Sequence, residues 1–232
     1  MALILYELGG RDDRRYSLYS WRARMALAHK GLTPEYRPVH VSDKAAIAFS
    51  KQDKVPILVD GETVVQDSFR IALHLEAHHG GASLFGGEVG QALARFFNSW
   101  VDRTLVPRLV PLIALDVQGI LDAADARHLR GVMEKAFGRT LEELVAHRDK
   151  DIVGFRRLLD PARASLRSQP FISGAQPAYP DYILFSLFQW ARIVSAFEVL
   201  EPKDALAAWR ERMLDLFGGL ARTQTSFSAT EG

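Results

Sequence analysis

The feature that most constrains the fold is a series of hairpin and helix signals within residues 54–76. Two short aliphatic runs, at 57–59 and 64–65, flank the dipeptide Asp60-Gly61. This dipeptide can supply the positive φ that a tight hairpin turn requires. The stretch therefore predicts a β-hairpin.

The chain is then predicted to pass from strand to helix. Asp67 and Ser68 are residues of the N-cap type, and Ile71 and Leu75 follow at a helical spacing of four. A helix N-terminus with free amides and a nearby hydroxyl can bind a carboxylate. This point in the chain is therefore a candidate binding site.

The order of these signals resembles the second half of the glutathione-binding domain of the soluble glutathione S-transferases. In that family the residue before a proline pairs its backbone with the cysteinyl part of glutathione, and an acidic residue with a serine holds the γ-glutamyl end. The resemblance gives these roles to Val55 with Pro56 and to Asp67 with Ser68. The sequence leaves open whether the Val55–Pro56 bond is cis. The alternative is an ordinary hairpin followed by a capped helix.

Basic or amide side chains close the glycyl end of glutathione in the family. Lys54, directly before the Val-Pro pair, matches one such position, and Lys44 matches only loosely. Both could instead be solvated surface lysines, since lysine is mostly exposed whatever its role.

Composition excludes several classes of function. The 232 residues are 48% hydrophobic with a net charge of +1, which indicates a globular protein and shows no electrostatic footprint for nucleic acid. No cysteine is present, so disulfides, thiolate metal sites and a protein thiol nucleophile are excluded. The first apolar run is too short for a signal peptide and no window approaches a membrane span, so we expect a cytoplasmic protein.

A well-marked helix is predicted within residues 16–31. Lys30 lies in its last turn and Gly31 stands where a C′ glycine belongs. Serine and tyrosine dominate its first turn, so hydroxyls point into the positive end of the helix dipole. The apolar residues at helical spacing are Leu18, Trp21, Met25 and Ala28.

A hydroxyl in this turn could favour a bound thiolate. Free thiols titrate near ~8.5, so a transferase must stabilise the anion. A charge-assisted hydrogen bond supplies roughly 1.5–3 kcal/mol without ionisation of the hydroxyl. Residues 17–22 and 26–31 resemble the pattern Ser-Pro-Tyr-x-Trp-Arg … Ala-Leu-x-His-Lys-Gly of the serine-type, bacterial β-etherase-like transferases.

This resemblance implies that Ser17 is the catalytic residue. Leu18 replaces the proline of the pattern, which leaves the register of the turn open. Tyr16, Tyr19 and Ser20 are the alternative hydroxyls. Ser17 could also be an N-cap alone, a role that serine commonly fills.

The remaining chain predicts a second, helical domain. Glycine-rich residues 81–87 form the expected linker after a first domain over 1–80, and 226–232 form a polar tail. Helical spacing without a convincing strand recurs over 88–225. This organisation is the glutathione S-transferase plan of an α/β thioredoxin-like domain followed by an all-α domain. The expected helices include 126–145, 152–166, 181–197 and 205–216.

The family's helical domain supplies the pocket for the second, electrophilic substrate. Residues 96–103 resemble its first helix, so Trp100 and Arg103, with Tyr16, are candidates for that pocket. Core packing is an equal alternative for Trp100. Residues 171–182 resemble the loop and capping box before the domain's buried helix, although Ala178 replaces the capping hydroxyl.

A metal site is not expected from the sequence. His74 and His78 stand four residues apart on the predicted second helix, with Glu76 between them. The order differs from His-Glu-x-x-His, and no obvious third ligand follows.

The sequence therefore predicts a glutathione transferase. Glutathione is the expected co-substrate, the partner is a small hydrophobic electrophile such as an aryl ether, and a homodimer is expected from the family. The missing cysteine excludes a cysteine-type thiol transferase. The alternatives are a non-catalytic protein that binds glutathione or hydrophobic ligands, and a glutathione-dependent isomerase or dehalogenase.

Overall fold

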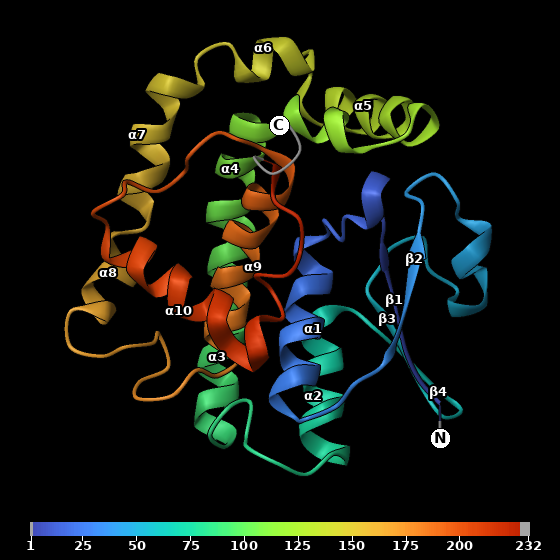
Figure 1. Ribbon diagram of the computed structural model, residues 1–232, viewed down its shortest axis with the longest axis vertical. Helices are drawn as coiled ribbons and strands as arrows, with labels where there is room; N and C mark the ends of the chain where they lie inside the picture. The colour runs from blue at the N-terminus through green and yellow to red at the C-terminus, as the bar shows by residue number, and fades with distance from the viewer. Residues whose placement is uncertain (1, 228–232) are drawn as a thin grey trace.

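The computed structural model describes residues 2–227, which form a small mixed sheet with its helices and a larger helical part beside it (Figure 1). The sheet has the strand order β2-β1-β3-β4. β1 runs parallel to β2 and antiparallel to β3, and β3 is antiparallel to β4. This confirms the predicted α/β class of the first part. The strands are β1 (Leu3–Leu8), β2 (Glu35–Val39), β3 (Ile57–Asp60) and β4 (Thr63–Gln66).

The predicted hairpin is present with its turn displaced by one residue. Asp60 pairs with Thr63 and so belongs to β3. The turn consists of Gly61 and Glu62, and Gly61 has a φ of 60°. Glycine adopts this left-handed conformation without the steric cost of a Cβ.

Helix α1 (Leu18–His29) lies between the sheet and the helical part and packs against both α2 (Ser68–His78) and α9 (Tyr179–Val194) (Figure 1). Trp21, Met25 and Leu27 are fully buried. Two short 3₁₀ helices, η1 (Arg11–Asp13) and η2 (Ala45–Ser50), complete the first part. The N-cap Ser17, Leu18 and residues 20–27 are all buried, so α1 is covered on several sides.

The helical part is organised around α9, whose residues are almost all buried. This confirms the helical character predicted for the second part of the chain. The other elements are α3 (Glu88–Trp100), a π-helical turn η3 (Val101–Leu105), α4 (Val106–Ile113), a 3₁₀ helix η4 (Asp116–Ile120), α5 (Ala123–Phe137), α6 (Leu141–Val145), α7 (Arg148–Leu158), α8 (Asp160–Leu166) and α10 (Ala205–Gly219).

Two helices predicted as continuous are interrupted. The 126–145 prediction breaks at Gly138, which takes a φ of 65° after α5, and Thr140 then begins α6 with a capping box. The 152–166 prediction breaks before α8, where Pro161 stands in the first turn. A proline lacks the N–H that a continuous helix would need there.

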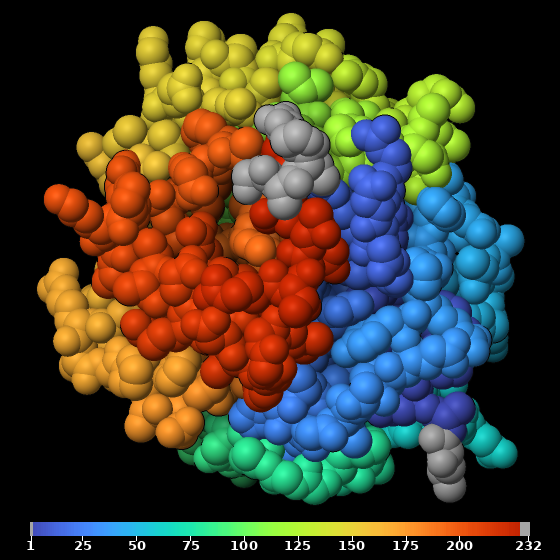
Figure 2. Space-filling view, viewed as in Figure 1, coloured from blue at the N-terminus to red at the C-terminus, as the bar shows by residue number. Residues whose placement is uncertain are grey.

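The end of the described chain lies against the segment that precedes α1. Figure 2 shows the red C-terminal segment directly beside the blue N-terminal segment. Gln224 Nε2 donates to the Asp13 carbonyl at 3.4 Å, and the Arg14 guanidinium lies 6.0 Å from the Phe227 ring centroid. Within the predicted polar tail, residues 228–232 lie outside the described range. Among residues 2–227, none of the helices is both long enough and apolar enough to cross a membrane.

Candidate functional site

Ser17 is the N-cap of α1, and it is buried. Its Oγ accepts a hydrogen bond from the Ser20 amide at 3.2 Å. This bond uses one lone pair and leaves the hydroxyl hydrogen to donate elsewhere. Capping and donation to a thiolate are therefore compatible, and the positive end of the helix dipole favours an anion at this point.

A cavity of about 210 Å³ opens beside Ser17. Lys54 and Val55 line it together with Ser17, as do Tyr19 and Lys44. The structure thus brings together the predicted catalytic serine and two of the predicted glutathione-binding residues, which the sequence separates by more than 35 positions. Pro56 is buried and follows Val55 directly, and the Val55–Pro56 bond is cis.

Lys44 and Lys54 place two ammonium groups at this cavity, whose lining also includes Asp43 and Asp53. Lys54 is exposed, and Lys44 Nζ donates to the Asp53 carbonyl at 2.9 Å. Ammonium groups beside an opening of this kind attract a carboxylate. Lys44, which matched the family only loosely, lines the cavity as Lys54 does.

Asp67 and Ser68 form the start of α2. Asp67 Oδ1 accepts the amides of Phe69 and Arg70, each at 3.0 Å, so Oδ2 is left to accept from an ammonium group. Asp67 has a φ of 73°, a conformation that costs a residue with a Cβ about 1–3 kcal/mol and is typical of ligand-binding positions. Ser68 is buried, and its carbonyl accepts from Tyr179 Oη at 2.8 Å.

Comparison with protein families identifies the family of this chain. The glutathione S-transferase C-terminal domain matches residues 92–220, and the glutathione S-transferase N-terminal domain matches residues 13–83. The chain belongs to the glutathione S-transferase family. This membership confirms the predicted resemblance to the glutathione S-transferases, whereas the serine-type, β-etherase-like branch stays a prediction.

Individual curated proteins match this family member over only part of its length. It is 27% identical over 145 residues to the glutathione S-transferase-like protein ustS of Aspergillus flavus, covering 55% of this chain and 50% of that protein. It is 40% identical over 81 residues to glutathione S-transferase Z1 of Arabidopsis thaliana, covering 30% of this chain and 37% of that protein. The chain therefore spans half or less of the length of these curated relatives.

Solved structures share the fold over nearly the whole chain. Glutathione transferase GSTFuA3 from Phanerochaete chrysosporium has a TM-score of 0.75 and 23% identity, covering 94% of this chain and 92% of that chain. The theta class glutathione S-transferase from Xanthomonas axonopodis pv. citri, solved with glutathione bound, has a TM-score of 0.67 and 21% identity, covering 97% and 98%. These likenesses confirm the glutathione S-transferase fold.

Tyr19 is the alternative hydroxyl that also lines the Ser17 cavity. Its ring lies under the Arg22 guanidinium, 4.9 Å from ring centroid to Cζ. Burial raises the pKa of Tyr19, the charges of Asp102 and Asp67 raise it further, and Arg22 opposes them.

Tyr16 and Ser20 face the interior instead. Tyr16 belongs to the main hydrophobic core, and burial raises the pKa of its hydroxyl. Neither the Tyr16 hydroxyl nor the Ser20 hydroxyl has a hydrogen-bond partner among the described residues. Neither residue lines the cavity beside Ser17.

Trp100 and Arg103, the other predicted second-substrate residues, also lie outside the lining of the Ser17 cavity. Trp100 is half-buried, with its ring centroid 5.3 Å from that of Phe97. Arg103 is exposed in the π-helical turn η3. Their role at a second-substrate pocket stays a prediction.

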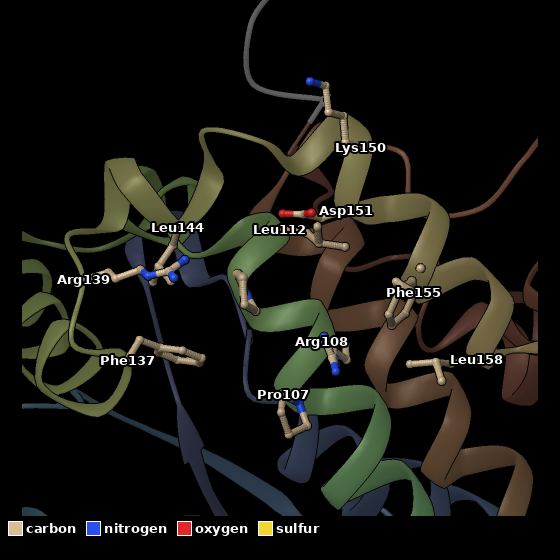
Figure 3. Close-up of a pocket in the computed structure, with 12 residues that line it drawn as sticks. Pro107, Arg108, Leu112, Phe137, Arg139, Leu144, Lys150, Asp151, Phe155 and Leu158 are labelled. Atoms are coloured by element: carbon tan, nitrogen blue, oxygen red, sulfur yellow. The ribbon is translucent and has the colours of Figure 1, made fainter.

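A separate cavity of about 710 Å³ lies between α4 and α7 (Figure 3). Arg108, Arg139 and Lys150 surround it, and the aromatic rings of Phe137 and Phe155 lie among its walls. It shares no lining residue with the cavity beside Ser17. The sequence analysis did not predict it, because its walls come from four helices and the loops between them.

His40 is a further cavity residue that the sequence analysis missed. Its Nδ1 lies 2.9 Å from Asp125 Oδ2, and the hydrogen bond to Asp125 raises the pKa of His40. Asp125 also accepts the Ser42 amide at 3.0 Å and the Ser42 hydroxyl at 2.6 Å. The cavity wall is therefore attached to α5 of the helical part, through residues more than 80 positions apart.

Proposed function

We propose that this family member is a glutathione transferase in which Ser17 donates a hydrogen bond to the thiolate of bound glutathione. The observation that supports this most directly is the shared cavity of Ser17, Lys54 and Val55 at the N-terminus of α1. A hydroxyl at a helix N-terminus stabilises an anion without itself ionising.

The other predicted residues are assigned to the cysteinyl, glycyl and γ-glutamyl parts of glutathione. The Val55 backbone pairs with the cysteinyl unit, while Lys54 binds the glycyl carboxylate. Asp67 presents its free carboxylate oxygen to the γ-glutamyl ammonium group, and the N-terminus of α2 with Ser68 receives the γ-glutamyl carboxylate.

The proposed reaction is attack of the thiolate on an electrophilic carbon. A carbon–sulfur bond forms while the bond from that carbon to the leaving group breaks, and the leaving group takes the electron pair. Holding both reactants in one site supplies much of the acceleration. The leading substrate is an aryl ether, because residues 17–22 and 26–31 resemble the β-etherase-like transferases.

The first test is turnover of Ser17→Ala. We expect kcat/KM with glutathione and an activated aryl halide or an aryl ether to fall about 10- to 100-fold, since a lost charge-assisted hydrogen bond weakens thiolate stabilisation by roughly 1.5–3 kcal/mol. The glutathione Kd should change little, and the apparent pKa of the bound thiol should rise.

Two matched variants make this test specific. Ser17→Gly also removes the hydroxyl but retains most of the capping preference, so it separates the chemistry from helix stability. Ser20→Ala removes the neighbouring buried hydroxyl and should leave kcat/KM near the wild-type value. A large loss in Ser20→Ala with none in Ser17→Ala would reject Ser17.

Product analysis separates the alternative functions. Wild-type protein that binds glutathione but converts neither substrate would favour a non-catalytic binding protein. Conversion that leaves the amount of free glutathione unchanged would instead favour an isomerase. A transferase consumes one glutathione for each product formed.

We also propose that the chain forms a homodimer through α3. Val89, Leu93 and Phe96 are 75%, 64% and 73% exposed and recur at helical spacing along this helix. A contiguous exposed apolar face of this kind is typical of an interface, and a second copy presents the same face. Light scattering should give twice the chain mass of 25.9 kDa.

Phe96→Asp should convert the dimer to the 25.9-kDa monomer, because it places a carboxylate in the proposed interface. Val153→Asp alters an exposed apolar residue on α7 and should leave the dimer intact. A wild-type mass of 25.9 kDa would contradict the proposal.

A further inference from the structure

Three side chains of the metal-ligating type meet at the end of the β3–β4 hairpin. Asp60 ends β3, His74 lies in α2, and His79 directly follows α2. Both histidines approach one carboxylate oxygen, with His74 Nε2 at 2.8 Å and His79 Nε2 at 2.7 Å from Asp60 Oδ2. The side chains of Asp60, His74 and His79 are only 19%, 12% and 22% exposed.

We infer that Asp60, His74 and His79 form a binding site for a divalent transition-metal ion. In the metal-free arrangement each Nε2 donates its hydrogen to the same oxygen. A divalent ion can take the place of both hydrogens and bind the same three atoms, with each imidazole neutral and its hydrogen on Nδ1; an imidazole that was protonated releases one proton. Two imidazoles and one carboxylate suit zinc or cobalt, with water as the fourth ligand.

The three ligand atoms already lie within 4.8 Å of one another, and the nitrogen–oxygen separations require only a small adjustment. Tetrahedral bonds of about 2.0–2.1 Å place ligand atoms roughly 3.3 Å apart. The observed nitrogen–oxygen separations of 2.7 and 2.8 Å must therefore lengthen by about half an ångström. Rotation of the Asp60 side chain at the hairpin end can supply this change, while β3 and α2 keep the backbone positions fixed.

The neighbouring His78 is not part of the site. Its ring stacks on His74 with centroids 4.4 Å apart, and its Nδ1 lies 3.0 Å from the His74 carbonyl. The sequence pairs His74 with His78, but the two histidines that approach Asp60 are His74 and His79. Asp60 is the third ligand, and it precedes the helix in the chain.

A second cluster, His40 with Asp122 and Asp125, has one oxygen of each carboxylate committed to other bonds, whereas the two Oδ2 atoms lie 3.2 and 2.9 Å from His40 Nδ1. Asp122 Oδ1 caps α5, and Asp125 accepts two hydrogen bonds from Ser42. The His40 side chain is also 60% exposed. This cluster serves as an internal comparison for the Asp60 site.

A bound ion would connect the β3–β4 turn to the C-terminal end of α2. None of its three ligands lines the cavity beside Ser17. We therefore expect the ion to stabilise the first domain rather than to take part in turnover.

The test is titration of the EDTA-treated, full-length protein with Co²⁺ and with Zn²⁺. We expect one equivalent to bind, visible d–d absorption from cobalt, and a rise in Tm of roughly 5 °C or more at 100-fold excess over Kd. Asp60→Asn and His79→Gln should each weaken binding at least tenfold while the metal-free protein keeps its circular dichroism spectrum.

His78→Gln and His40→Gln are the controls. Each removes an imidazole that is not one of the three ligands, so both should bind cobalt with a Kd close to that of the wild type. The inference is overturned if the wild type binds neither ion, if His79→Gln binds as the wild type does, or if His40→Gln abolishes binding.

Discussion

Asp181→Ala is expected to lower the free energy of unfolding by roughly 3–5 kcal/mol. The Asp181 side chain is fully buried at the start of α9. Its carboxylate accepts the amides of Ile172, Ser173 and Ala178 at 2.7, 3.1 and 3.2 Å, and Trp209 Nε1 at 3.0 Å. Alanine would leave the buried Trp209 indole N–H and three part-buried amides without their acceptor, and a cavity beside them.

Chemical denaturation of the wild type and of the variant measures this loss. Asp149→Ala is the matched control, because Asp149 also lies in the first turn of a helix but is exposed. That control should change the free energy of unfolding by less than about 1 kcal/mol. A similarly small change for Asp181→Ala would show that its hydrogen bonds do not hold the start of α9.

The sequence predicted the helix starts of the first domain well, because these depend on neighbours in the chain. Ser17 caps α1 and Asp67 caps α2, as the local residue types indicated. The same local signals placed Asp181 in the first turn of α9, three residues after Ala178 at the N-cap. They could not show Trp209 as a fourth donor, because 28 residues separate it from Asp181.

Contacts between distant segments account for what the sequence did not predict. His40 meets Asp125 across 85 positions, and Asp60 meets His79 across 19. Neither pair has a fixed spacing that periodicity could reveal, because the fold alone brings them together. The breaks before α6 and α8 have local causes instead. Gly138 and Pro161 mark them in the sequence, but the prediction of continuous helices did not use these two residues.

The connection between the two domains provides the other prediction of large effect. Arg22 in α1 is fully buried, and its Nη2 lies 2.7 Å from Asp102 Oδ1 in the π-helical turn. Its Nη1 donates to Asn98 Oδ1 at 3.0 Å and its Nε donates to Ser186 Oγ at 3.2 Å. A single guanidinium thus joins α1 to α3, η3 and α9.

We expect Asp102→Ala to lower the free energy of unfolding by about 3–5 kcal/mol, because it leaves a buried guanidinium that cannot deprotonate. Arg22→Met should cost less, roughly 1–3 kcal/mol, because it removes the charge and keeps much of the side-chain volume. Arg22→Met leaves the Asp102 carboxylate without its partner, but Asp102 is 27% exposed, so water can solvate it.

Denaturation of both single variants and of the double variant tests this asymmetry. In Arg22→Met with Asp102→Ala the buried charge is absent, so the combined cost should be smaller than the sum of the single costs. Glu35→Ala, which breaks an exposed ion pair with Arg37, should have little effect. If Asp102→Ala lowered the free energy of unfolding by less than Arg22→Met does, Asn98 and Ser186 would be sufficient partners for the guanidinium.

The Arg22–Asp102 ion pair also lies next to the proposed glutathione site. The Arg22 guanidinium covers the Tyr19 ring, and Tyr19 lines the cavity with Ser17. Asp102→Ala should therefore weaken glutathione binding as well as stability, whereas Asp181→Ala should act mainly on stability. Comparing the glutathione Kd of the two variants under conditions where both are folded separates an effect on the cavity wall from a general loss of packing.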